Sequence, residues 1–299
     1  MPANVLNAII ALSKYRNNNL GDYANNYAIR INAVGEKLEY YVKDLLTGKF
    51  YNSENERDLA YSRHYSYLGN QNNAVDAIAK GGDAFEIKKI ESRPASLSFG
   101  KIALNNSPPK DVLHSGDRRL RGDVKEIDGG NWAEKDIFYA VGATAGAAVK
   151  YLYFVQGTCY AARAEVYDRI FQEVKQNVRG TMQSSGIEFE PTKELGRVHR
   201  VDPLGITDFR LRGMWEIRNP ADVFRSIAPL DARGAFTCYA IMEEGKFNAL
   251  SSEVPANLYG NGLIEQSQVG GPIRVERVNV KDPNNPAKLK DAVLIKVEW

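Results

Sequence analysis

The sequence contains little cysteine and little histidine. Its 299 residues include two cysteines, Cys159 and Cys238, and three histidines. Both cysteines lie in apolar, strand-like runs, which favours buried free thiols in a reducing compartment over a disulfide framework. His64, His114 and His199 lack the spacing of metal ligands, so a zinc site and the histidine-based motifs of nucleases and metalloproteases are excluded.

Long hydrophobic runs and an excess of one charge are also absent. The apolar segment Val5 to Leu12 has no basic flank and no cleavage site, and no run approaches the length of a membrane span. We therefore expect a cytoplasmic protein. The formal net charge is only +2, so DNA binding would require Lys and Arg to gather on one face. No linker of disordered composition interrupts the chain, which predicts a single domain over residues 1–299, with a core over about 30–220 and a C-terminal elaboration over about 221–299.

The segment Asn73 to Glu91 carries the clearest chemical pattern. Two strand-like runs flank Gly81-Gly82, and in the second run Glu86 and Lys88 share one face because side chains on a strand repeat every two residues. If a three-residue loop containing both glycines joins the runs, Asp76 lies directly opposite Glu86 on that face. A two-residue loop would place Asp76 on the other face. Glycine supplies the positive φ that the longer loop requires, so the sequence permits this register.

An aspartate followed across a hairpin by Glu-x-Lys fits metal-dependent phosphodiester cleavage. Two carboxylates can bind Mg²⁺, which prefers oxygen ligands and keeps several waters. The metal would polarise the scissile phosphate and lower the pKa of a bound water, while the ammonium of Lys88 orients that water or stabilises the developing charge. Asp76 and Glu86 are the candidate metal ligands. A solvated strand face with a cross-strand ion pair stays open as the other interpretation.

Residues 1–46 are predicted to be helical, with a polar break at residues 17–19. Val34, Leu38 and Val42 belong to one apolar stripe at helical spacing, and Glu39 lies on its border. Glu39 either flanks a buried site or is a solvated edge residue. The tyrosines and arginine between residues 52 and 73 either contact a sugar-phosphate backbone or pack in the core, and the sequence does not choose.

The next segments predict a mixed β-sheet with helices packed on it. Residues 136–144 and 149–161 are apolar runs that predict buried strands, and 164–178 predicts a helix with a stripe from Val166 to Val178. Further strands are predicted over 236–242, 273–280 and 292–299, as a peripheral sheet or dimerisation element. The expected fold class is therefore α/β, with a mixed central sheet flanked by helices and additional C-terminal strands.

Two basic segments are candidates for DNA contact. Residues 92–110 are rich in Ser, Asn and Pro, which predicts a long irregular loop that leaves the hairpin and can lie in a DNA groove. Arg210 and Arg212 share a predicted strand face, where planar guanidinium groups suit guanine edges or phosphates, although a surface strand with acidic partners is equally compatible. The candidate DNA-binding residues are Lys101, Asn105, Lys110, Arg118, Arg119, Arg121, Arg210 and Arg212.

Four stretches carry a family resemblance: Gly81 to Glu91, Leu104 to Lys110, Trp132 to Tyr139, and Glu194 to Thr207 with Arg212 to Trp215. In this order, over roughly residues 30–220, they resemble the NgoPII-type family of type II restriction endonucleases, which is similar to the wider PD-(D/E)XK nucleases. The resemblance implies a mixed sheet with flanking helices and a Mg²⁺-dependent homodimer that cuts a short GC-rich palindrome of the GGCC kind in double-stranded DNA. It also implies a cognate DNA methyltransferase that protects host DNA without forming a stable complex.

The resemblance implies that Asp76, Glu86 and Lys88 occupy the catalytic positions of the family. It also implies that Glu39 corresponds to the acidic residue of the first helix. Two departures accompany it. Val75 stands where the superfamily often has proline, and residues 118–131 lack cysteines expected in relatives, so target specificity can differ. A repair or junction nuclease would use the same catalytic residues on branched or damaged DNA. A non-cleaving DNA-binding protein would not need the three together.

Overall fold

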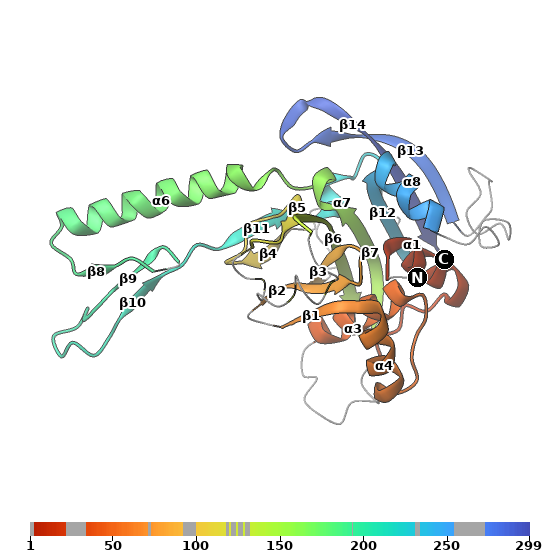
Figure 1. Cartoon of the computed structure of the whole chain (residues 1–299), viewed down its shortest axis with the longest axis horizontal. Helices are drawn as coiled ribbons and strands as arrows, with labels where there is room; N and C mark the ends of the chain where they lie inside the picture. Colours follow the sequence, from red (N-terminus) through yellow and green to blue (C-terminus); the bar gives the residue numbers. More distant parts are fainter. Residues whose placement is uncertain are drawn as a thin grey trace.

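A nine-stranded mixed sheet forms the centre of the protein (Figure 1). The computed structural model describes residues 3–21, 34–70, 73–91, 100–117, 120, 124, 128, 132–192, 194–230, 234–253 and 273–299. The strand order is β1-β2-β3-β6-β7-β12-β14-β13, with β5 paired to β6. These strands are β1 (Tyr65–Asn70), β2 (Asn73–Ala79), β3 (Ala84–Glu91), β5 (Val112–His114), β6 (Glu134–Ala145), β7 (Ala148–Gln156), β12 (Thr237–Glu243), β13 (Ile273–Asp282) and β14 (Asn285–Glu298).

The central strands are the apolar, β-branched and aromatic runs of the sequence. β6 and β7 are buried along most of their length, as expected for strands covered on both faces. The predicted strands over 136–144 and 149–161 are confirmed, except that the second ends early in a 3-10 turn, η1 (Gly157–Cys159). The sheet is mixed because β3 pairs with β6, and β7 with β12, in parallel. Cys159 and Cys238 are buried free thiols, as predicted.

Helices cover one face of the sheet, and a mixed layer covers the other. The first face carries α1 (Val5–Tyr15), α3 (Val34–Thr47), α4 (Glu54–His64) and α8 (Glu244–Glu253). The second carries α7 (Pro220–Val223) and a two-stranded sheet of β4 (Lys101–Asn105) and β11 (Trp215–Arg218). The predicted α/β fold with a mixed sheet flanked by helices is confirmed. Among the described residues, no helix has both the length and the apolar character needed to cross a membrane.

The tyrosines before the hairpin belong to the core. Tyr61, Tyr65 and Tyr67 are each less than 10% exposed. Tyr61 donates its hydroxyl hydrogen to Asp44, and Tyr65 donates to the carbonyl oxygen of Lys43. Burial with these internal partners decides the alternative left open by the sequence in favour of packing.

An arm projects away from the sheet (Figure 1). It consists of α6 (Ala164–Ser184) and a three-stranded sheet of β8 (Phe189–Glu190), β9 (Gly196–Val198) and β10 (Phe209–Leu211). The predicted helix is confirmed, but the prediction that it packs on the central sheet is wrong. All of α6 is described and none of its residues is buried; Val166, Ile170 and Val174 are each 43% exposed. The first turn of the helix instead contacts β11, with the rings of Tyr167 and Trp215 5.6 Å apart between centroids.

Two further expectations differ from the structure. Residues 101–105, predicted as irregular loop, form β4: the strand pairs with β11, and its alternate residues Ile102 and Leu104 point into the core beneath the central sheet. Residues 92–99 lie outside the described residues. The C-terminal strands do not form a separate peripheral sheet: β12 pairs in parallel with β7, and β14 and β13 continue the same central sheet.

Candidate active site

The β2–β3 hairpin adopts the predicted register. Ala77 lies opposite Phe85 and Ile78 opposite Ala84, which places Asp76 opposite Glu86 when continued by one residue. Residues 80–82 form the three-residue loop, with Gly81 at a φ of 63°. A residue outside the hairpin also binds this loop: the backbone N–H of Gly81 donates a hydrogen bond of 3.0 Å to the Asp128 carboxylate. Loop length and glycine together therefore set the face on which Asp76 lies.

Asp76, Glu86 and Lys88 form one compact cluster. The ammonium of Lys88 lies 2.5 Å from Glu86 Oε1 and 3.8 Å from Asp76 Oδ2. Asp76 also accepts a hydrogen bond of 2.5 Å from the backbone N–H of Ile87. The three side chains are 15–20% exposed, so they are screened from most of the solvent but still accessible. The sequence-predicted constellation is brought together as expected.

A close backbone approach beside β2 fixes the position of Asp76. Gly69 in β1 lies where a methyl group would stand 2.0 Å from the carbonyl oxygen of Val75 and 3.1 Å from the Cα of Asp76. The β1–β2 pairing is also irregular between Leu68 and Asn70. Only glycine permits strands this close, because any Cβ would clash with the neighbouring backbone.

Glu39 lies beside this cluster and forms an ion pair with Lys43. The Lys43 ammonium contacts Glu39 Oε1 at 3.3 Å, one helical turn along α3, and its side chain is only 7% exposed. Both residues influence the pKa of Asp76, which favours the first of the two interpretations of Glu39. Sequence reasoning missed Lys43. The available signal was its place four residues after Glu39, directly after Val42 of the apolar stripe.

The pKa shifts follow from burial and crowding of charge. Burial raises the pKa of Asp76, and Glu39 adds to the rise, while Lys88 acts against it. Burial also raises the pKa of Glu86, reinforced by Asp76 and opposed by Lys88. For Lys88, burial alone would lower the pKa, but Glu86 and Asp76 together raise it. The cluster therefore holds two carboxylates close together beside one charged ammonium. A further cation bound between the carboxylates would relieve the repulsion between them.

The donor set at this cluster suits a hard cation with few protein ligands. Asp76 and Glu86 provide carboxylate oxygens on one strand face, and Mg²⁺ is commonly held by one or two carboxylates together with waters and substrate phosphates. Among the described residues, no group of three or more His, Cys, Asp or Glu side chains is arranged to hold a metal ion. Two carboxylates without His or Cys in the cluster are a donor set of the kind that Mg²⁺ takes, whereas protein zinc sites commonly use three or four ligands that include His or Cys.

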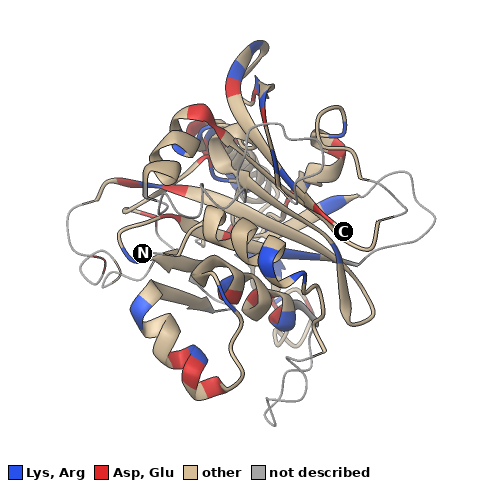
Figure 2. Cartoon of the chain, turned by 90° about the vertical axis from the view of Figure 1, so that its right-hand side faces the viewer, with Lys and Arg blue, Asp and Glu red and all other residues tan. Residues whose placement is uncertain are grey.

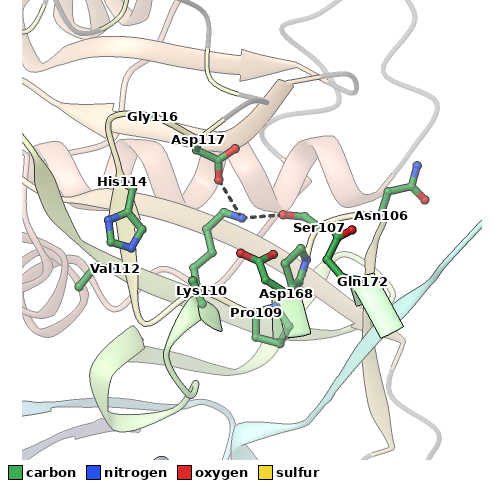
Figure 3. A pocket seen from close by; sticks show the side chains of 12 residues that line it. Asn106, Ser107, Pro109, Lys110, Val112, His114, Gly116, Asp117, Asp168 and Gln172 are labelled. Carbon is green, nitrogen blue, oxygen red and sulfur yellow. Dashed lines mark hydrogen bonds and ion pairs between the residues drawn. The ribbon is translucent and has the colours of Figure 1, made fainter. Parts of the chain in front are cut away.

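The loop of residues 106–117 and the first half of α6 enclose an open cleft of about 630 Å³ (Figure 3). Lys110 projects into this cleft, with its ammonium 2.9 Å from Ser107 Oγ and 3.0 Å from Asp117 Oδ2. Lys110 also lines a smaller pocket with Glu86 and opposes the rise in the Glu86 pKa. This residue thus connects the cleft with the carboxylate cluster.

The other candidate DNA contacts are spread over separate places. Lys101 and Asn105 are exposed on β4, where Lys101 lies 3.4 Å from Glu216. Arg210 and Arg212 are about half exposed on the arm and both contact Glu194, so they do have an acidic partner in the free protein. Arg118, Arg119 and Arg121 lie outside the described residues. On the side away from the arm, Lys and Arg are interspersed with Asp and Glu (Figure 2).

Comparison with known proteins decides the family. A family model described as NgoPII restriction endonuclease matches residues 3–269. The chain belongs to the NgoPII restriction endonuclease family. The type II restriction enzyme NgoPII of Neisseria gonorrhoeae is 40% identical to it over 267 residues, which cover 89% of each chain. No solved structure matches the chain.

Membership of the NgoPII family makes the protein a type II restriction endonuclease, a site-specific endonuclease that acts on DNA. The match extends beyond the residues 30–220 that carried the resemblance in the sequence, and includes α1, β12 and α8. Two partners of the candidate residues went unnoticed in the sequence, Asp117 beside Lys110 and Glu194 beside the arginine pair. Both contacts depend on how the chain folds back on itself, and no local pattern indicates them.

Proposed function

We propose that the protein cleaves both strands of a short GC-rich palindromic site, of the GGCC kind, in a Mg²⁺-dependent reaction. The observation that carries this proposal is the partly buried cluster of Asp76, Glu86 and Lys88 in a chain of a restriction endonuclease family. Two carboxylates with raised pKa values beside a charged lysine match the needs of phosphodiester hydrolysis.

In this proposal each residue of the cluster has a separate role. Asp76 and Glu86 hold Mg²⁺, which supplies polarisation of the scissile phosphate and a lower pKa for a bound water. The ammonium of Lys88 orients the attacking water and stabilises negative charge that develops on the phosphate oxygens. Glu39 and its ion pair with Lys43 border the site and set the charge around Asp76.

We also propose a symmetric homodimer, because a palindromic duplex has twofold symmetry and a double-strand cut requires two copies of one active site. The chain itself forms one domain in this proposal, since β12, β13 and β14 continue the sheet that carries the hairpin. It acts in the cytoplasm, where a cognate methyltransferase protects host DNA without a stable complex. Sedimentation with a cognate duplex is expected to show two chains per duplex. One chain per duplex, with nicking only, would refute the dimer.

Digestion of a plasmid of known sequence tests the proposed activity. With Mg²⁺ the protein is expected to give a fixed set of fragments whose ends map to one short GC-rich palindrome. Omitting the metal, or adding a chelator, is expected to leave the plasmid intact. Cleavage only at branched or damaged sites would instead identify a structure-specific nuclease, and metal-independent cleavage would exclude the proposed chemistry.

The remaining basic candidates are proposed as DNA contacts. Lys110 lies nearest to the cluster, in the cleft beside Glu86, and is placed to contact a backbone phosphate. Lys101 and Asn105 extend the contact along β4. The proposal also includes the basic residues Arg118, Arg119 and Arg121.

Arg210 and Arg212 can contact either guanine edges or phosphates, and mutation separates the two roles. Loss of a bidentate base contact is expected to cost about 1 to 3 kcal/mol of discrimination at one base pair. Loss of a phosphate contact is expected to weaken all sequences alike and to reduce the salt slope by roughly one. Competition binding of Arg210→Ala and Arg212→Ala in Ca²⁺, over a salt series, measures both. Wild-type affinity, specificity and salt slope in both variants would show that neither arginine touches DNA.

A further inference from the structure

A single carboxylate, Glu194, joins the two arginines of the arm. Glu194 Oε2 lies 3.2 Å from Nη2 of Arg210, and Nε of Arg212 lies 3.0 Å from Oε1. The Glu194 side chain is 20% exposed, whereas the two arginine side chains are 50% and 47% exposed. The carboxylate therefore lies beneath two guanidinium groups that face solvent.

The contact orients the arginines without occupying them fully. A guanidinium group has five N–H donors, and Arg212 contacts Glu194 through Nε. Its two terminal amino groups then point away from the backbone and are available to a second acceptor. Arg210 contacts Glu194 through Nη2, which leaves further donors on the same plane. Because a guanidinium group is planar, a contact that holds one of its edges also fixes the direction of its remaining N–H donors. That direction decides whether these donors can form a bidentate contact with a base or a phosphate.

Glu194 is itself held by the loop that leads to the active site. Asn106 donates its side-chain N–H to Glu194 Oε1 at 3.4 Å. Asn106 is followed directly by Ser107, which contacts Lys110 in the cleft beside Glu86. Glu194 thus links Arg210 of β10, and Arg212 just after that strand, to a wall of the cleft next to the catalytic cluster.

We propose that Glu194 is a positioning residue for DNA recognition, which aims Arg210 and Arg212 and at the same time lowers the positive charge of the arm. The inference rests on the proposed contact of these arginines with DNA. A carboxylate near the DNA repels every phosphate alike and so weakens binding to all sequences. Oriented guanidinium groups strengthen only the contact to the correct base edge. The repulsion changes cognate and non-cognate affinity by the same factor, so only the orientation of the guanidinium groups increases the ratio between the two affinities.

Glu194→Gln tests the proposal, with Glu188→Gln as its matched control. Glu188 is an exposed glutamate between α6 and β8, so its replacement removes the same charge from the same arm without touching the arginine pair. Affinity in Ca²⁺ is measured over a salt series for a duplex with the site mapped by plasmid digestion and for singly substituted duplexes. Glu194→Gln is expected to bind substituted duplexes more tightly and to lose about tenfold or more in discrimination. Glu188→Gln is expected to change discrimination little.

The outcomes separate the inference from the function on which it rests. Half-exposed ion pairs contribute little stability, so Glu194→Gln is expected to fold like the wild type. If Glu194→Gln strengthens cognate and substituted duplexes equally, or leaves both unchanged, Glu194 does not position the arginines. The double variant Arg210→Ala/Arg212→Ala provides the second comparison. If it alters specificity or salt slope while Glu194→Gln does not, only this inference fails. If the double variant alters neither, the proposed DNA contact fails as well.

Discussion

Alanine at Asp76, Glu86 or Lys88 is expected to abolish DNA cleavage while the fold and, in Ca²⁺, specific DNA binding persist. All three side chains converge on one point, with the Lys88 ammonium within 4 Å of both carboxylates. They would serve the metal and the attacking water, whereas binding energy comes from phosphate and base contacts elsewhere. Loss of one preorganised electrostatic group at a reacting phosphate lowers the rate by more than about 100-fold.

Single-turnover cleavage in Mg²⁺ and duplex binding in Ca²⁺ measure the two properties separately. Asp58→Ala is a suitable control because Asp58 is an exposed carboxylate on α4, which is outside the cluster. The control is expected to cut and bind like the wild type. Any variant of the cluster that cuts at a near wild-type rate would remove that residue from the active site.

Asp44→Ala is expected to destabilise the protein by about 3 to 5 kcal/mol, because it leaves a buried arginine without its counter-ion. The Asp44 side chain is fully buried in α3 and lies 3.0 Å from Nε of Arg57, whose side chain is 3% exposed. Asp44 also accepts a 2.7 Å hydrogen bond from Tyr61. This contact joins α4 to the same helix that carries Glu39 and Lys43, so a loss of stability would reach the border of the active site.

Urea unfolding followed by circular dichroism measures the effect on Asp44→Ala. Asp58→Ala again serves as the control, since a surface substitution changes stability by no more than about 0.5 kcal/mol. The double variant Asp44→Leu/Arg57→Leu is expected to recover much of the loss, because removing both charges leaves no uncompensated ion. A destabilisation of Asp44→Ala no larger than that of the control would show that the pair does not anchor α4.

The sequence predicted that Asp76, Glu86 and Lys88 lie together because the geometry of this cluster is local. Three residues on one hairpin are related by a period of two and by one loop length, and both are visible in the order of amino acids. The spacing of four residues pairs Lys43 with Glu39, but the place of this pair beside the cluster depends on how α3 docks on the sheet. The place of Glu194 depends on how the arm folds back, and no local pattern encodes either arrangement. The apolar stripe of α6 is a second case in which the sequence predicts an element but not its contacts. Its spacing predicts a helix with an apolar face, but periodicity does not state what that face contacts.

The lack of buried residues in α6 bears on how readily this helix unfolds by itself. A helix of 21 residues that buries none of its side chains gains little free energy from tertiary packing, so it can unfold locally while the central sheet remains intact. Backbone amides of α6 are then expected to exchange with deuterium through local opening, and those of β6 and β7 only through global unfolding. DNA held against the arm would slow exchange in α6 most. The order of α6 would then depend on whether DNA is bound to the arm.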